Sequence, residues 1–433
     1  MDPAATQRGI VTRIALVCSE PLRPRMAGIG IRYQELAHRL PRPGIEIVVV
    51  SAGELSQVPD LPAISDLRPF ERGALATTLE DCDGVIAQGQ LANDVLLEVP
   101  QLPCAIDLYD PWLVENLHYH ETLGLDPYRN DHATWVLQLS RGDFFVCSSE
   151  EQRNFYLGLL TALGRVNPPR VAADPDLQSL IAIAPFGIPQ QLPPHRPILE
   201  SAPEGTRRLL FGGLYDWYDP WTLLDALALL EESNRDRLWQ LLLVRNPNAE
   251  ATPQQLFQQV EDWCREHGWW GSKVLAVDWV AFERRYDLLR DVDLMVTPHR
   301  PSLETRLSLR TRFLDAIAAG CPAVTTEGGA MSRWLQGFEA GWIVPPQDTE
   351  ALAEALREAL DDEEALERRS RGAERLRKEF AWERVLEPLV EFCRQPRRDA
   401  NKEAFAFCPP TLSPPDPPAF RAKRWLRRKI SPS

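Results

Sequence analysis

Short apolar runs alternate with longer stretches of helical hydrophobic spacing along most of the chain. Six runs lie in the first half, at Ile14–Val17, Ile45–Val50, Val85–Ala87, Ala105–Leu108, Phe144–Cys147 and Ile181–Ala184. Five more follow in the second half, at Leu209–Phe211, Leu241–Val244, Val274–Val277, Leu294–Val296 and Ala323–Val324. Such runs, separated by helical patterns, are typical of parallel sheets with helices on both faces. The pattern therefore predicts an α/β fold with two Rossmann-like domains.

A proline-rich segment without periodicity, Phe186–Glu204, separates the two series of runs. From Thr349 the pattern becomes helical, with Thr349 as the expected N-cap. Regular spacing ends after Arg394, and six prolines between residues 408 and 418 indicate a disordered linker. We therefore predict domains over residues 1–190 and 205–378, a helix over 379–394, and a disordered Pro-rich and basic tail over 395–433.

Charge and cysteine spacing narrow the class of protein. The chain has 433 residues and a formal net charge of −14, which argues against general nucleic-acid binding. Its eight cysteines form no CxxC pair or zinc spacing, as expected of buried reduced thiols in a cytoplasmic protein. No signal peptide or membrane-spanning run is expected. The His118, His120 and Glu121 group is a weak metal signal, so we expect no metal site.

The basic end of the chain, Phe420–Ile430, interleaves six Lys or Arg residues with apolar side chains. Such a segment can lie on an anionic membrane surface, which would place the protein peripherally at the inner face of the membrane. The alternative is a solvated disordered end, and the sequence favours neither interpretation.

The stretch Leu294–Thr326 reads as a strand, a polar loop, a helix and a second strand, which is a parallel βαβ unit. The polar loop holds His299, Arg300 and Glu304, and the helix is predicted over Leu309–Ala319 with Ser308 at its start. Ligands bind at the carboxyl ends of the strands in open α/β sheets. We therefore predict a ligand site in this loop.

The predicted helix start has the chemistry of a pyrophosphate site. Residues 308–312 would offer free backbone N–H groups there, and Arg310 and Arg312 could neutralise the anion. Asp315 lies among apolar neighbours and needs a partner, for which ribose hydroxyls are suitable. The alternative is a solvated helix face with unrelated charges.

Three further segments follow strand ends. Gly28 and Gly30 open a helix predicted over Tyr33–Leu40, either beside a ligand or in a tight turn. Gly212 and Gly213 precede three aromatic residues that either stack on a ligand or pack under an interdomain cleft, namely Tyr215, Trp217 and Tyr218. Asp110 either faces the cleft or belongs to an Asp-Pro turn.

Five segments in chain order resemble motifs of glycosyltransferase family 4, the retaining enzymes of the GT-B fold. The segments are MAGIGIRYQELAHRL, FFVCSSEEQRNFYLG, IAPFGIP, RFLDAIAAGCPAVTTEGGAM and AGWIVPPQDTEALAEAL. In this order they are similar to the family's glycine-rich loop, VSE element, PNGVD element, LEAMAAGxPVV signature and GxLVPPxD ending. The resemblance covers about residues 12–395.

The resemblance implies two domains facing across a cleft, with the nucleotide-sugar donor held mainly by the second and the acceptor by the first. The helix over 379–394 would cross back to the N-terminal domain. Of the two carboxylates in the family's E-x7-E motif, the second corresponds to Asp315, which would hold the ribose. The first falls on Leu307, so Glu304 is the expected substitute for a contact with the donor sugar.

The Arg and Lys that the family usually carries after the first strand of its second domain are also missing, because that loop reads LYDWYDP. Arg310, Arg312 or Arg245 would then balance the diphosphate. The resemblance and the strand-end positions together give the expected donor contacts: Gly28, Gly30, Gly212, Gly213, Tyr215, Arg245, His299, Ser308, Leu309, Arg310, Arg312 and Asp315. The expected catalytic residues are Asp110, Glu304 and Arg310.

The activity implied is retaining transfer from a nucleotide-diphosphate sugar to a sugar, lipid-linked or small-molecule acceptor, without a metal or another cofactor. Cell-surface polysaccharide, glycolipid or glycoconjugate synthesis would use such a reaction. The altered motif leaves two alternatives open. One is a weakly active or inactive nucleotide-sugar-binding protein on the same fold, and the other is a sugar-nucleotide epimerase.

Overall fold

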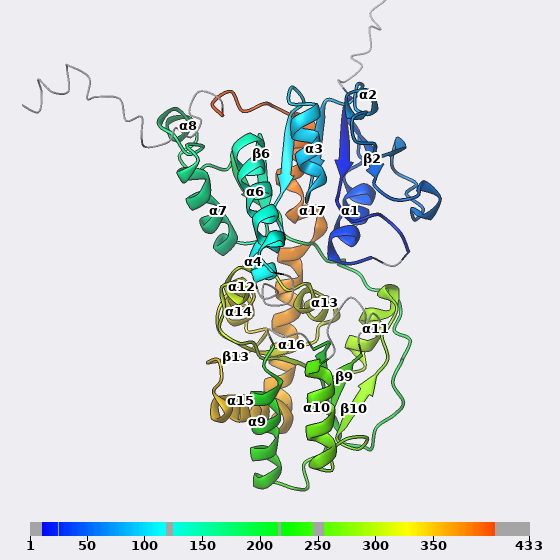
Figure 1. Ribbon diagram of the computed structural model, residues 1–433. Coiled ribbons are helices and arrows are strands. Elements are labelled where there is room, and N and C mark those ends of the chain that lie inside the picture. The colour runs from blue at the N-terminus through cyan, green and yellow to red at the C-terminus, as the bar shows by residue number, and fades with distance from the viewer. Residues whose placement is uncertain (1–10, 25, 118–123, 215–217, 246–254, 403–433) are drawn as a thin grey trace, which may run out of the picture.

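The computed structural model describes residues 11–24, 26–117, 124–214, 218–245 and 255–402. In this part of the chain two parallel sheets form two domains, one above the other in Figure 1. The first sheet has the strand order β3-β2-β1-β4-β5-β6-β7, and the second has the order β10-β9-β8-β11-β12-β13. The predicted pair of Rossmann-like sheets is confirmed.

The first domain is built around seven strands. These are β1 (Thr12–Val17), β2 (Ile45–Ser51), β3 (Asp66–Pro69), β4 (Gly84–Ala87), β5 (Cys104–Asp107), β6 (Phe144–Cys147) and β7 (Ile181–Ile183). The helical elements are α1 (Gly28–Arg39), η1 (Leu55–Gln57), α2 (Leu75–Thr78), α3 (Leu91–Glu98), α4 (Trp112–Asn116), α6 (Asp126–Arg141), α7 (Glu150–Ala162) and α8 (Pro168–Ala173).

The second domain is built around six strands. These are β8 (Arg207–Gly212), β9 (Trp239–Val244), β10 (Val274–Val277), β11 (Leu294–Thr297), β12 (Ala323–Thr326) and β13 (Gly341–Val344). Its helical elements are α9 (Pro220–Ser233), α10 (Gln255–Glu266), η3 (Phe282–Arg284), α11 (Arg285–Arg290), α12 (Leu303–Leu307), α13 (Thr311–Ala319), α14 (Ala330–Gly337), α15 (Thr349–Asp361) and α16 (Glu363–Arg377). The chain then returns through η4 (Lys378–Phe380), α17 (Trp382–Val385) and α18 (Glu387–Arg394).

Every apolar run predicted as a strand overlaps a strand, but two strands were not predicted. β3 and β13 each lie at an edge of a sheet. An edge strand pairs on one side only and needs fewer apolar residues, which accounts for β3 but not for β13, because β13 reads GWIV and is mostly buried. β3 reads DLRP and has no buried residue, so its sequence carries no hydrophobic signal.

Three predicted helix starts are wrong. The helix predicted from Leu309 begins at Thr311, and Ser308 follows the separate helix α12. Helix α15 is capped by Asp348, whose carboxylate accepts the backbone N–H of Ala351, so Thr349 is the first helical residue rather than the cap. Helix α1 begins at Gly28, five residues before the predicted start at residue 33, because its first turn is closed by backbone bonds such as Ile31 N–H to Ala27 O.

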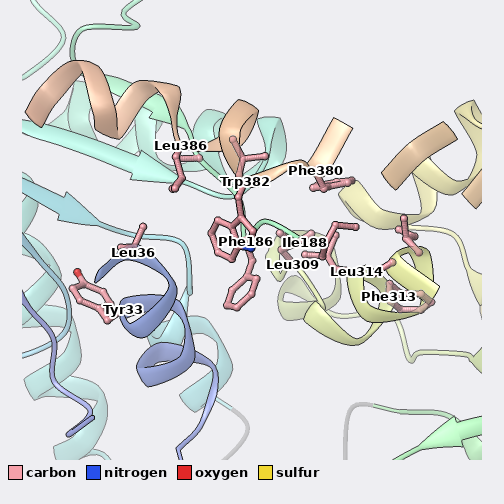
Figure 2. Packing of buried hydrophobic residues seen from close by; sticks show 14 of the residues in the cluster. Tyr33, Leu36, Phe186, Ile188, Leu309, Phe313, Leu314, Phe380, Trp382 and Leu386 are labelled. Carbon is pink, nitrogen blue, oxygen red and sulfur yellow. The ribbon is translucent and has the colours of Figure 1, made fainter. Parts of the chain in front are cut away.

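An apolar cluster joins the two domains where the chain crosses between them (Figure 2). The segment after β7 contributes Phe186 and Ile188, and the returning segment contributes Phe380 and Trp382. The backbone N–H of Ile188 donates to the carbonyl of Phe380 over 2.8 Å. These two crossings therefore run side by side.

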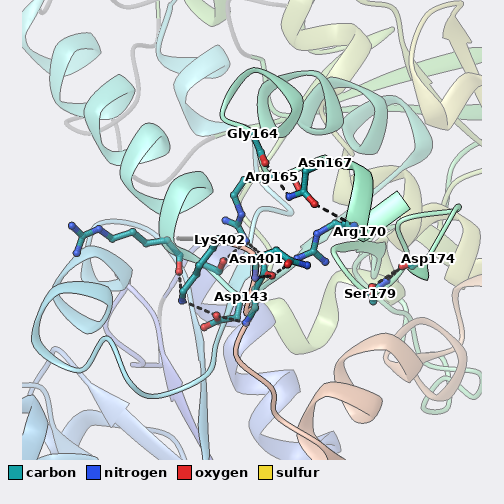
Figure 3. Close-up of polar contacts among 12 residues, drawn as sticks. Asp143, Gly164, Arg165, Asn167, Arg170, Asp174, Ser179, Asn401 and Lys402 are labelled. Carbon is teal, nitrogen blue, oxygen red and sulfur yellow. Dashed lines mark hydrogen bonds and ion pairs between the residues drawn. The ribbon is translucent and has the colours of Figure 1, made fainter. Parts of the chain in front are cut away.

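The return to the N-terminal domain differs in detail from the expected helix over 379–394. It consists of η4, α17 and α18, and α18 contacts β1 and β6 of the first sheet. The chain then stays attached through residue 402, although residues 395–402 were expected within the disordered tail. Ion pairs explain this attachment, because the carboxylate of Asp399 pairs with Arg165 at 2.6 Å and with Arg170. Lys402 pairs with Asp143 at 2.7 Å, as Figure 3 shows.

Seven cysteines in the described residues are free and buried, as expected. Their burial raises the pKa of each thiol, for example to about 12 at Cys18 and to about 11 at Cys82. None of the helices described here combines the length and hydropathy needed to cross a bilayer.

Candidate active site

His299 occupies the position directly beyond the carboxyl end of β11, close to the middle of the second sheet. Its backbone N–H donates to Thr326 Oγ1 over 3.1 Å, which ties the loop to the end of β12. The side chain is 3% exposed, and Nε2 has no hydrogen-bond partner among the described residues. Burial, followed by the charges of Arg310 and Arg312, lowers the pKa of His299 well below 6.5, so the imidazole is neutral at pH 7.

Glu304 lies on α12 rather than in a loop, which corrects the sequence prediction. Ser302 caps this short helix by accepting the backbone N–H of Thr305. The Glu304 side chain is 2% exposed, and Arg310 Nη2 approaches it to 2.5 Å. A buried carboxylate requires such a partner, and Arg310 supplies it from the start of α13.

Ser308 does not offer the free amide expected of a helix start. Its backbone N–H donates to the carbonyl of Glu304 over 2.8 Å, because Ser308 closes α12. The Ser308 hydroxyl donates to Glu115 Oε1 of the first domain over 3.1 Å. Ser308 therefore lies on the boundary between the two domains.

A narrow pocket opens at the start of α14, between the ends of β11 and β12. Its lining includes His299, Arg310, Thr325, Gly328 and Gly329. Gly329 has a φ of 87°, and a Cβ there would lie 2.6 Å from the Thr305 carbonyl oxygen, so only glycine fits. A helix start beside a neutral imidazole and a guanidinium is suited to an anionic or hydroxyl-rich ligand.

Two carboxyl groups of the first domain face this side of the second. Removal from water raises the pKa of Asp110 well above 3.8, and the neighbouring charges of Glu115 and Glu304 raise it further. Burial, followed by Glu304, also raises the pKa of Glu115, to which Asp110 is hydrogen-bonded. Asp110 is therefore within electrostatic range of Glu304 of the second domain, and Glu115 is a residue of this region that the sequence did not reveal.

The β8 loop holds Arg312 rather than leaving it free. Arg312 Nη1 donates to the Gly213 carbonyl over 2.8 Å, and a Cβ on Gly213 would lie 3.3 Å from Nη2. Gly212 has a φ of 77°, which favours glycine at this turn. Tyr218 is buried and its ring packs edge-on against His299, with centroids 4.9 Å apart, so this aromatic residue packs beneath the site.

Three expected donor contacts lie apart from this cluster or have other partners. Asp315 is paired with Arg285, at 2.9 Å between Oδ1 and Nε, and burial raises its pKa. Leu309 packs its side chain in the interdomain apolar cluster of Figure 2, which leaves only its backbone for a ligand. Arg245 is exposed beyond β9, with its guanidinium 6.0 Å from the Phe257 ring centre.

The start of α1 is already occupied by a carboxylate of the same chain. Glu20 accepts the backbone N–H groups of Ala27 at 2.5 Å and Gly30 at 2.7 Å. A Cβ on Gly28 would lie 3.1 Å from the hydroxyl of Tyr109, and one on Gly30 would lie 2.7 Å from Met26 Sδ. Both glycines therefore lie in closely packed surroundings, whereas a tight turn was the alternative to a ligand contact expected from the sequence.

The structure thus brings His299, Glu304, Ser308, Arg310 and Asp110 together at the domain boundary. Thr325, Thr326 and the Gly328–Gly329 turn complete the pocket. The Gly-Gly pair after a strand was the sequence signal for this turn. Glu115 had no signal, because only the fold brings it to Ser308.

Tyr215, the group of His118, His120 and Glu121, and the segment Phe420–Ile430 lie outside the described residues. Within the described ranges, no group of three or more His, Cys, Asp or Glu residues is arranged to hold a metal ion.

Residues 206–362 match the family model described as Glycosyl transferases group 1. A stretch of 73 residues is 40% identical to the glycogen synthase of Mycobacterium tuberculosis and covers 17% of this chain and 18% of that protein. The D-inositol 3-phosphate glycosyltransferase of Jonesia denitrificans is 25% identical over 241 residues, which cover 53% of this chain and 54% of that protein. The chain therefore matches about half or less of the length of these relatives.

The solved structure of Anabaena HepE in complex with UDP-glucose resembles the chain over almost its whole described length. The TM-score is 0.61 at 13% identity, covering 88% of this chain and 98% of that one. A likeness at this identity shows the fold, and the expected two-domain GT-B architecture is confirmed by it.

Proposed function

We propose that this chain moves a sugar from a nucleotide-diphosphate sugar to an acceptor with retention at the anomeric carbon. The match of residues 206–362 to the group 1 glycosyl transferases supports the proposal. The observation that carries the proposal is the cluster of His299, Glu304 and Arg310, which faces Asp110 across the domain boundary. The cluster combines the guanidinium cation of Arg310, helix N–H groups and carboxyl groups at one site.

On the donor side, a diphosphate leaving group needs positive charge or aligned N–H dipoles, because negative charge develops there in the transition state. Arg310 and the start of α14 supply both at one pocket, which has a volume of about 10 Å³ and would have to widen to admit a diphosphate. A bound diphosphate would draw Arg310 from Glu304 and free this carboxylate for hydroxyl groups of the donor sugar. The unpartnered Nε2 of the neutral His299 would accept or donate a hydrogen bond to the same sugar.

On the acceptor side, Asp110 would receive the proton of the attacking hydroxyl group. The acceptor oxygen forms a bond to the anomeric carbon on the same face from which the phosphate oxygen departs, so the configuration is retained. The bond from this carbon to the phosphate oxygen breaks, and the electron pair leaves with the nucleoside diphosphate. A carboxyl group with a raised pKa is a stronger base than an ordinary one once it is ionised. Domain closure would exclude water, which otherwise hydrolyses the donor.

The remaining expected contacts extend the same proposal. Gly212, Gly213 and Arg312 would line the nucleotide side, where the β8 and β11 loops meet. Asp315 would hold a ribose hydroxyl group beside its ion pair with Arg285, which uses Oδ1. A sugar, lipid-linked or small-molecule acceptor, as in polysaccharide, glycolipid or glycoconjugate synthesis, remains part of the proposal.

One observation favours a second candidate, a nucleotide-sugar-binding protein that does not transfer the sugar. Leu307 occupies the position of the first family carboxylate, and the substitute Glu304 is held by Arg310. Donor binding without consumption, over a panel of acceptors, would support this candidate. Isomerised nucleotide sugar without an acceptor would instead indicate an epimerase.

The experiment is a thermal-shift screen of nucleotide sugars that includes UDP-glucose, followed by donor turnover. A ligand at 100 times its Kd stabilises the folded state by about 2.7 kcal/mol, which such a screen detects. Arg310→Ala should lower turnover by about 100-fold or more, the usual effect of removing a transition-state donor. Arg306→Ala is the matched control, because Arg306 is an exposed arginine of α12. Wild-type turnover in both Arg310→Ala and Asp315→Ala would contradict these site assignments.

A further inference from the structure

Leu307 belongs by sequence to the second domain, yet its side chain packs in the apolar core of the first. It is 6% exposed, and every other buried residue of that cluster lies between Ala15 and Ile181. The helix that carries it, α12, contacts α4 and α7 of the first domain. The burial of Leu307 therefore depends on the closed arrangement of the two domains.

The backbone of Leu307 is held by a buried amide of the first domain. Gln152 Nε2 donates to the Leu307 carbonyl over 2.9 Å and to the Tyr109 carbonyl over 3.0 Å. Its Oε1 accepts the backbone N–H of Ser148 over 2.7 Å, which fixes the orientation of the amide. A buried donor that loses its acceptor is unfavourable, so this amide favours the position of Leu307 seen here.

Neighbouring polar contacts act in the same direction. The Ser308 hydroxyl donates to Glu115 Oε1 over 3.1 Å, and Arg333 pairs with Glu151 at 3.0 Å. The first contact is adjacent to Leu307 in sequence, whereas the second is exposed and contributes little. The anchor is therefore Leu307 with Gln152, supported by Ser308.

We propose that Leu307 and Gln152 are positioning residues that anchor the segment 303–310 on the first domain. Glu304 and Arg310 lie on either side of the anchor, so their place in the site is set by the first domain although they belong to the second. Separation of the domains would withdraw Leu307 from its cluster and break its bond to Gln152. The anchor does not depend on the proposed transfer reaction, because it consists of apolar packing and a hydrogen bond and requires no catalytic step.

The position that carries a carboxylate in the family motif thus has a different use in this chain. A carboxylate at position 307 would enter an apolar cluster and would need a partner there. Leucine at this position is therefore consistent with a contact between domains and not with a contact to a sugar hydroxyl group.

Hydrogen exchange measured by mass spectrometry on the full chain tests the anchor. Leu307→Ala should increase exchange at least tenfold in peptides covering 303–310 and in those covering α4. Leu303→Ala is the matched control, since Leu303 lies on the same helix and is 39% exposed. Leu307→Met should restore the protection, because methionine can fill the same space.

Gln152→Met provides a second variant that keeps Leu307 and removes the N–H donor. It should increase exchange in the same peptides and, once a donor is identified, lower kcat at an unchanged donor KM. Unchanged exchange over 303–310 in both variants would overturn the proposal. A uniform rise throughout residues 12–183 would also overturn it, because it would show a general role in the first core. A protein with no transferase activity would still give the exchange result, so the two proposals fail separately.

Discussion

Asp107→Asn removes the carboxylate that neutralises a guanidinium group with no access to solvent. Arg32 and Asp107 are both 0% exposed, and their two contacts measure 2.6 Å and 3.2 Å. Breaking a buried pair by removing one partner costs about 3–5 kcal/mol. The guanidinium group of Arg32 still donates to the carbonyls of Ala184 and Pro185, at 2.8 Å and 3.0 Å. We therefore expect the free energy of unfolding to fall by about 3 kcal/mol, near the lower end of this range.

The free energy of unfolding is measured by urea unfolding followed by circular dichroism. In thermal unfolding, the same loss should lower the transition temperature of a domain of this size by about 6–12 °C. Asp126→Asn is the control, because the Asp126–Arg129 pair is 92% and 70% exposed and should contribute less than about 1 kcal/mol. The double variant Arg32→Met with Asp107→Leu should lower the free energy of unfolding by less than the sum of the two single changes. A loss for Asp107→Asn equal to that of the control would refute the reasoning.

Three more predictions concern the anchored end and the two perturbed sites. Asp399→Asn leaves Arg165 without its buried counter-charge and should lower the free energy of unfolding by about 3 kcal/mol, measured as a shift in the urea midpoint. An unchanged midpoint would contradict a stabilising role for residues 395–402, the end of the chain in Figure 3. The pKa values of Asp110 and Glu115 are raised on folding, so their protonated forms favour the folded state. Their contribution to the free energy of unfolding is complete below about pH 4 and is lost as the pH rises through the raised pKa values. Asp110→Asn should therefore raise the urea midpoint at pH 7 while lowering turnover, and a lower midpoint would contradict this. Because the pKa of His299 is lowered, stability should fall as pH drops below about 6.5, and His299→Gln should reduce this acid sensitivity in midpoints measured from pH 7 to pH 5.

The sheets were predictable because buried strands carry a continuous apolar signal. Each predicted run overlaps one of β1, β2 and β4 to β12. Strand β3 lacks an apolar signal, whereas β13 was missed although it reads GWIV and is mostly buried. The pairing order of the strands was not predicted. Local capping was less predictable, since Thr349 and its neighbour Asp348 can both cap a helix and only the backbone geometry distinguishes them.

The candidate site was predictable at the ends of strands and unpredictable across the domain boundary. His299 follows β11 directly, so the sheet alone places it. Glu115 meets Ser308 although 193 positions separate them, and no local pattern encodes this contact. Leu307 was recognised as lacking a carboxylate, but its burial in the first domain depends on how the two domains pack.

The most direct test of the proposed function is the anomeric configuration of the product. The full chain is incubated with a stabilising nucleotide sugar and a panel of sugar and lipid-linked acceptors, and the product is followed by proton nuclear magnetic resonance. Retaining transfer predicts nucleoside diphosphate release that depends on the acceptor and a product with the anomeric configuration of the donor. Donor binding without any release of nucleoside diphosphate, or a product of inverted configuration, would contradict it.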